Sequence, residues 1–184
     1  MANLEPQQHA ELINAFDGLV DDLGVLVIDT AVGIFDSVIG LVRASQEILL
    51  VVGDESSSIT DAYVLIKILQ ADHGASHFRA VANMMGSSIE GENLFRKLES
   101  VTDRFLDVTL RYAGEKPFDE NARKSVKRQR VSVEAFPESK SSTAYRKLAK
   151  DVPRGHLEFF AERLVSNPVG AWPGGEDCNL KRDD

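Results

Sequence analysis

Short apolar runs, separated by stretches with helical spacing, most restrict how this chain can fold. Residues 25–28 and 47–52 consist almost entirely of valine, leucine and isoleucine, as expected for parallel strands covered on both faces. Two further runs follow at 78–82 and 108–113. The intervening stretches are long enough for the crossovers that parallel strands require. We therefore predict an α/β fold with an open, mainly parallel sheet and flanking helices.

Apolar residues at helical spacing predict where the crossover helices lie. Ile34, Val38, Leu41 and Val42 form one apolar face, and residues 63–69 repeat the pattern in the next segment. We expect another amphipathic helix over 12–20, before the first run. After the last run we expect a basic helix, a short apolar segment and a final helix, at 120–130, 131–136 and 142–150.

Capping residues predict the ends of two of these helices. Ser58 with Asp61, and Ser87 with Glu90, have the spacing of capping boxes, in which side chains and free backbone amides satisfy each other. Gly74 is placed to end the helix that Ser58 would begin.

The overall charge and the cysteine content exclude several classes of function. Acidic residues outnumber basic ones 29 to 21, and a net charge of -8 argues against a direct nucleic-acid binder. Cys178 is the only cysteine, so one chain can build neither a disulfide nor a thiolate zinc site. No apolar run approaches the roughly 20 residues of a membrane span. We expect a cytoplasmic protein.

Composition divides the chain into three parts. We expect one α/β domain over residues 1–152 and a separate amphipathic helix over 153–166, with Leu157, Phe160 and Leu164 on one side. That helix packs on the domain or contacts a partner or the inner-membrane surface. Residues 167–184, rich in glycine, proline and charge, are expected to be disordered.

Polar residues follow the expected strands, where ligands bind in open α/β sheets. Asp29 and Thr30 come directly after the first run, Asn83 follows the third, and Pro117 and Asp119 follow the fourth. A carboxylate placed directly after an apolar strand can hold a magnesium ion through water, as in the Walker B arrangement. The alternative for Asp29 is a helix N-cap.

Five segments, in order, resemble the MinD/ParA family of ATPases. They are VLVIDTAVGI (25–34), VGDESSSITDAY (52–63), ANM (82–84), YAGEKPFDE (112–120) and RGHLEFFAER (154–163). The last of these is similar to the C-terminal helix of FleN/FlhG flagellar regulators in particular. Phe35 stands where those proteins carry a small residue, and Glu115 and Lys116 occupy a strand end that is apolar in the family.

The resemblance implies roles for individual residues in binding ATP and Mg²⁺, the cofactors of the family. Asp29 would serve magnesium through water, and the amide of Gly33 would sense the γ-phosphate. Asn83, Pro117 and Asp119 would lie beside the adenine.

The 184 residues contain neither a Gly-x-x-x-x-Gly-Lys-Ser/Thr pattern nor the Lys-Gly-Gly start of its deviant form. We therefore expect a partial MinD-like P-loop fold whose N-terminal strands are missing, which leaves 25–28 as an exposed apolar edge. Losing about four phosphate hydrogen bonds, at roughly 1.5–3 kcal/mol each, removes most of a micromolar affinity. This chain alone is expected to bind ATP weakly and to be inactive as an ATPase.

The resemblance implies a FleN/FlhG-like regulator of flagellar number and flagellar gene expression. Its implied partners are a FleQ-like transcriptional activator or flagellar assembly proteins, and its relatives form homodimers across the nucleotide. The helix over 60–70 would present the dimer and partner surface. The alternatives are an ATPase of another MinD/Mrp-like class and a non-functional truncated copy.

Overall fold

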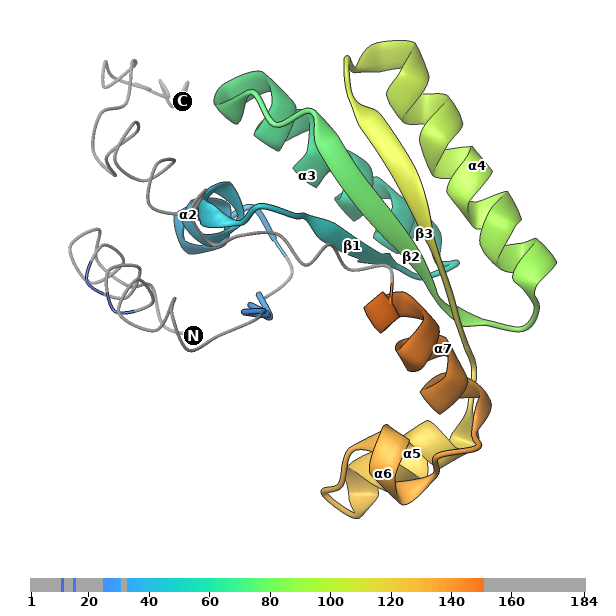
Figure 1. Cartoon of the computed structure of the whole chain (residues 1–184). Coiled ribbons are helices and arrows are strands. Elements are labelled where there is room, and N and C mark those ends of the chain that lie inside the picture. Colours follow the sequence, from blue (N-terminus) through green and yellow to red (C-terminus); the bar gives the residue numbers. More distant parts are fainter. Residues whose placement is uncertain (1–10, 12–14, 16–24, 31–32, 151–184) are drawn as a thin grey trace, which may run out of the picture.

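A computed structural model describes residues 11, 15, 25–30 and 33–150. Within them, three strands form a parallel sheet in the order β1-β2-β3, with helices between the strands (Figure 1). The strands are β1 (Leu49–Val52), β2 (His77–Met85) and β3 (Thr109–Pro117). The helices are α2 (Asp36–Ala44), α3 (Ser56–His73), α4 (Ser88–Phe105), α5 (Glu120–Lys127), α6 (Ser132–Ala135) and α7 (Lys140–Lys150). The predicted α/β class and parallel sheet are confirmed.

One face of the sheet forms the main core. Phe78, Ala80 and Ala82 alternate along β2 and are buried, as are Leu50 and Val52 of β1. They pack with four aliphatic side chains from the inner faces of α3 and α4: Ile66, Leu69, Leu94 and Leu98. The predicted apolar face of α3 is thus confirmed. Its packing holds β1 and β2 in place, and polar residues follow the carboxyl ends of these strands.

The expected strand over 25–28 is absent from this structure. Residues 25–30 belong to no strand, and the edge of the described sheet is β1, where Val51 is 62% exposed. A strand depends on ladder hydrogen bonds to a neighbour, and composition alone cannot supply that neighbour. Residues 25–28 are apolar, as the prediction required, but they do not pair with a strand of the described sheet.

Two of the three predicted helix ends are confirmed. Gly74 ends α3 with a φ of 66°, and its amide donates to the carbonyl of Gln70. Ser87 is the N-cap of α4 and accepts a hydrogen bond from the amide of Glu90, while the Glu90 carboxylate accepts from the amide of Gly86 at 2.9 Å. The capping box therefore closes one residue earlier than in its usual form.

Ser58 is not an N-cap, contrary to the prediction. Helix α3 begins at Ser56, after Glu55, whose backbone is extended. The Ser58 hydroxyl accepts a hydrogen bond from the amide of Gly53 at 2.9 Å and thereby ties β1 to the first turn of α3. The serine still satisfies a free amide, but the amide belongs to the strand-to-helix turn.

The chain after β3 folds into three helices that lie beyond the carboxyl ends of β2 and β3 or against β3 (Figure 1). The predicted basic helix is confirmed as α5, although it ends at Lys127. The short apolar segment contains α6, and the last helix begins at Lys140, two residues before its predicted start.

The predicted helix over 12–20, the segment 153–166 and the tail 167–184 lie outside the described residues, save for residue 15. A search of the helices in the described part of the chain found none with the length and apolarity to cross a membrane.

Candidate functional site

The carboxyl ends of β2 and β3 bring together the residues expected beside a nucleotide base. Asn83 pairs with Lys116, and Met85 pairs with Pro117 across the parallel ladder. Asn83 and Pro117 are both half-buried at this edge. The side-chain amide of Asn83 can both donate and accept hydrogen bonds, which is what recognition of a purine base requires.

A bulge at Met84 shapes this edge. The pairing shifts between Asn83 and Met85, and Met84 has a φ of 61°, in the left-handed region that side chains other than glycine rarely adopt. Pairing continues past the bulge, because the amide of Phe118 donates to the carbonyl of Met85 at 2.9 Å. The bulge leaves the Met84 side chain largely exposed.

A second irregularity lies further back on β3. The register shifts beside Gly114, which has a φ of 131°. A Cβ placed on Gly114 would lie 3.5 Å from Leu148, so α7 packs closely against the strand at this point. The shift also places Glu115 where its carboxylate reaches the start of α4.

The Glu115 carboxylate joins β3 to α4. It accepts hydrogen bonds from the hydroxyls of Ser88, at 2.8 Å, and Tyr112, at 3.1 Å. Burial by itself raises the pKa of Glu115, but these two bonds and the charge of Lys147 outweigh it and hold the pKa below its usual range. Burial and the Glu115 charge raise the pKa of Tyr112 well above its usual range.

Helix α4 can approach this cluster because position 91 is a glycine. A Cβ on Gly91 would lie 2.7 Å from the Tyr112 hydroxyl and 3.0 Å from the Cβ of Glu115. Gly91 is buried, and the ring of Phe95, one turn further along α4, lies 5.1 Å from the ring of Tyr112. Glu115, the unexpected polar residue at this strand end, is therefore hydrogen-bonded within the domain.

Asp119 lies where α5 and α7 begin. One carboxylate oxygen accepts from the amide of Asn121 at 2.8 Å, which makes Asp119 the N-cap of α5, and the other accepts from the amide of Ser141 at 2.9 Å. The bond from Ser141 is the main cause that lowers the pKa of Asp119; burial opposes it, and the bond from Asn121 helps to keep the pKa below its usual range.

Sequence reasoning missed the serines that support Asp119. Ser142 is fully buried; its hydroxyl accepts from Ser139 at 2.9 Å and lies 2.7 Å from the carbonyl of Phe136, to which it donates. The Ser139 hydroxyl also accepts from the amide of Ser142 at 3.2 Å. The signal was present, because a serine directly before a helical segment, as Ser139 is here, is typical of an N-cap.

Asp29 and Gly33 belong to none of the strands that form this edge. Asp29 is exposed in the segment that forms no strand, and Gly33 has a φ of 134°. A Cβ on Gly33 would lie 2.9 Å from the ring of the exposed Phe35, which would have to shift, and the positive φ itself favours glycine at this position. The described residues contain no cluster of three or more His, Cys, Asp or Glu side chains placed to hold a metal ion.

Comparisons with known proteins show that the chain is similar to two flagellar proteins. No protein-family model matches the chain. The chain is 58% identical to the antiactivator FleN of Pseudomonas aeruginosa over 177 residues, which cover 92% of the chain and 63% of FleN. It is 24% identical over 171 residues to the flagellum site-determining protein YlxH of Helicobacter pylori, with 85% of the chain and 58% of YlxH covered.

The chain is similar to FleN/FlhG flagellar regulators over most of its own length. It spans less than two thirds of the length of either relative. The resemblance noted from the sequence motifs is confirmed. In the structure, the polar residues that follow β2 and β3 have two kinds of surroundings. Asn83 and Pro117 lie at the open edge of the sheet, whereas Asp119 is engaged in holding two helices.

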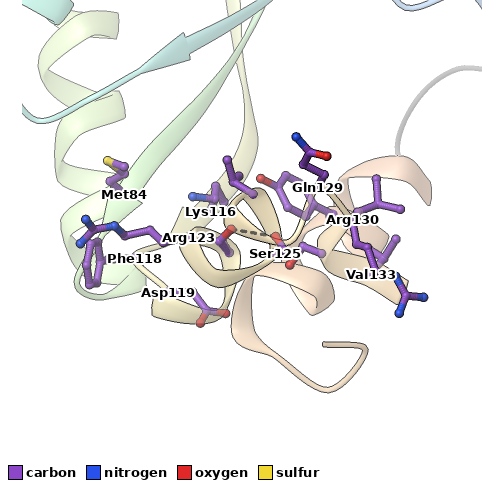
Figure 2. A pocket seen from close by; sticks show the side chains of 14 residues that line it. Met84, Lys116, Phe118, Asp119, Arg123, Ser125, Gln129, Arg130 and Val133 are labelled. Carbon is purple, nitrogen blue, oxygen red and sulfur yellow. Dashed lines mark hydrogen bonds between the residues drawn. The ribbon is translucent and has the colours of Figure 1, made fainter. Parts of the chain in front are cut away.

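The chain also has a hollow next to this edge, with a volume of about 760 Å³ (Figure 2). Asp119 lines it, together with residues from the end of β3 and from α5, but Asn83 and Pro117 do not. Of the three predicted base-binding residues, Asp119 alone therefore lines this hollow.

Proposed function

We propose that the chain acts as a FleN/FlhG-like regulator that controls flagellar number and flagellar gene expression in the cytoplasm. The observation that carries this proposal is the 58% identity to the antiactivator FleN over 92% of the chain. The name of that relative points to restraint of an activator, so the partner that we propose is a flagellar transcriptional activator. Flagellar assembly proteins are the second group of partners.

The outer face of α3 is the surface that we propose for a partner or for a second copy of the chain. Its inner face is committed to the core through Ile66 and Leu69. Its outer face carries exposed Asp61, Val64 and Lys67. The helix is held at both ends, by the Ser58 bond to Gly53 and by the αL cap at Gly74, so this face is presented in one orientation.

Association with the activator tests the regulatory role. The full chain is immobilised and incubated with the flagellar activator of the same organism without nucleotide, and retention of the activator is expected. Val64→Ser on α3 should weaken retention, whereas Val101→Ser on α4 is the matched control, since the two valines are 37% and 39% exposed. Absence of any association by the unaltered chain contradicts retained regulation.

We propose that nucleotide is held by two groups of residues. Asn83 and Pro117 would contact the base, and Asp119 would fix the backbone beside it, through the α5 cap. Asp29 would hold magnesium through water, and the amide of Gly33 would lie at the terminal phosphate. The exposure of Asp29 and the hydrogen-bonding capacity of Asn83 fit these roles. Bound Mg²⁺-ATP would supply the switch between regulatory states.

The chain alone is proposed to bind ATP weakly and not to hydrolyse it, because its 184 residues contain no phosphate-binding loop pattern. Calorimetric titration with Mg²⁺-ATP is expected to show a dissociation constant well above micromolar. Magnesium-dependent ATP hydrolysis by the purified chain would overturn this part of the proposal and favour the alternative, an ATPase of another MinD-like class.

A further inference from the structure

The positive charge of this acidic chain is concentrated in one segment. Residues 116–150 contain ten basic and four acidic side chains, a net charge of +6, although the whole chain carries -8. The remainder of the chain therefore carries -14. Such a local reversal of sign attracts an acidic partner to one part of the surface.

The hollow of about 760 Å³ lies within this basic segment and is apolar inside. Val126 and Val131 are 75% and 59% exposed, and Phe118, Met84 and Tyr145 are also exposed among the lining residues. Figure 2 shows Met84 and Phe118 at one end of the hollow and Arg130 and Val133 at the other. Exposed apolar side chains gathered around a concavity are typical of a docking site.

Cations surround these apolar side chains. Lys116, Arg123 and Arg130 line the hollow, and Lys127 and Arg128 are exposed at the end of α5. Nearby acids offset only part of this charge, because the segment has ten basic and four acidic side chains. The Glu134 carboxylate lies 4.0 Å from Arg130 with both side chains 63% exposed, a weak pair in water.

The helix that carries the cations is fixed in place. Asp119 caps its first turn, and the amides of Arg128 and Arg130 both donate to the carbonyl of Ser125 beyond its last turn. The guanidinium of Arg128 lies 5.1 Å from the centre of the Phe136 ring. A rigid surface loses little conformational freedom on binding.

We propose that this surface, formed by Lys116, Phe118, Arg123, Val126, Arg130 and Val131 and named here the α5 surface, docks an acidic amphipathic segment of a partner protein. Apolar side chains of the segment enter the hollow and its carboxylates meet the surrounding cations. The proposal rests on the proposed regulatory function, since it adds a second contact with that partner, separate from the outer face of α3. The apolar lining favours a protein over nucleic acid, whose phosphates contact only polar groups.

A synthetic peptide tests the α5 surface directly. The probe is a fluorescein-labelled peptide with leucines at helical i, i+3, i+4, i+7 spacing and glutamates at the other positions, and a second peptide has lysines in place of the glutamates. Fluorescence anisotropy with the full chain should show binding of the glutamate peptide only. Raising the salt to about 0.5 M should weaken the binding several-fold, because exposed charges are screened.

Two variants, each with a matched control, test separately the contributions of charge and of apolar contact to binding. The double variant Arg123→Glu, Lys127→Glu should weaken binding of the glutamate peptide roughly tenfold or more. The control, Lys97→Glu with Arg104→Glu on α4, makes the same change of charge and should have little effect on binding. Val126→Ser should weaken binding several-fold, and Ile89→Ser is the control, because Ile89 is 71% exposed on α4. Circular dichroism checks that each variant is folded.

Several outcomes overturn the proposal. Equal binding of both peptides, or equal effects of the α5 and α4 variants, shows that the α5 surface is not selective. Tighter binding of duplex DNA or of phosphatidylglycerol vesicles than of the glutamate peptide assigns the surface to a different partner class. Peptide binding without retention of the flagellar activator contradicts the proposed function alone, and retention that is insensitive to the α5 variants contradicts the α5 surface alone.

Discussion

The carboxylate of Asp119 accepts a hydrogen bond from the backbone amide of Ser141 at 2.9 Å, across 22 positions of sequence. The same carboxylate caps α5 through the amide of Asn121. One side chain thus sets the starts of two helices, and with them the position of the basic helix next to the end of β3. A negative charge at two helix N-termini is favoured by both helix dipoles.

Replacing Asp119 with alanine should destabilise the domain by roughly 1–2 kcal/mol, since one substitution removes two capping interactions from a partly exposed position. Urea unfolding followed by circular dichroism measures the change. Glu120→Ala is the control, because it alters an adjacent exposed carboxylate that is not the cap. Equal losses for the two variants would show that Asp119 has no special structural role.

Gly91→Ala should destabilise the domain by roughly 1–3 kcal/mol, since the added methyl group would overlap the Tyr112 hydroxyl and crowd Glu115. Gly40→Ala on α2 is the matched control, because its new methyl group would meet nothing within 4 Å. That control should be stabilising by roughly 0.5–1 kcal/mol, as expected for glycine replaced inside a helix. Thermal melting of the two variants should therefore shift in opposite directions.

The sequence predicted the parts of the fold that depend on local patterns. Ile66 and Leu69 follow helical spacing, so their burial could be predicted, and Gly74 was recognisable because few other residues adopt a left-handed cap. Whether residues 25–28 form a strand could not be predicted in this way. A strand requires a hydrogen-bonded neighbour, and the apolar run alone does not show whether one is present.

The site was predictable only in part, for a related reason. That Asn83 and Pro117 come to one edge followed from parallel strands ending on the same side. The bulge at Met84 and the capping of α7 by Asp119 depend on contacts between segments far apart in sequence, which no local pattern encodes. Glu115 stood out in the sequence only as an unexpected polar residue, and its hydrogen bonds to Ser88 and Tyr112 explain it.

Tyr112→Phe should destabilise the domain at neutral pH by roughly 0.5–1.5 kcal/mol, the usual net value of a hydrogen bond. It should also raise the pKa of Glu115 toward its usual range, because one of the donors that lower it is removed. The folded-state pKa of Glu115 lies below the unfolded value of about 4.3, so its stabilisation is present above that pH and is lost as the pH falls through the folded pKa.

Acid sensitivity therefore gives the decisive measurement for Tyr112. The difference in unfolding free energy between about pH 7 and about pH 3.5 should be smaller in Tyr112→Phe than in the unaltered chain. Tyr63→Phe, at a half-buried position on α3, should leave that difference unchanged. A Tyr112→Phe chain with undiminished acid sensitivity would show that the hydroxyl does not control the ionisation of Glu115.

Met84→Gly should stabilise the domain or leave its stability unchanged, although it removes a side chain from a strand. Met84 has a φ of 61°, a conformation that costs roughly 1 kcal/mol or more for residues with a Cβ and nothing comparable for glycine. Its side chain is 58% exposed, so little apolar contact is lost. Gln129→Gly relieves the same type of conformation, with a φ of 53°, outside the sheet. If urea unfolding shows that Met84→Gly is destabilising by more than about 1 kcal/mol while Gln129→Gly is not, the methionine side chain itself holds the bulge.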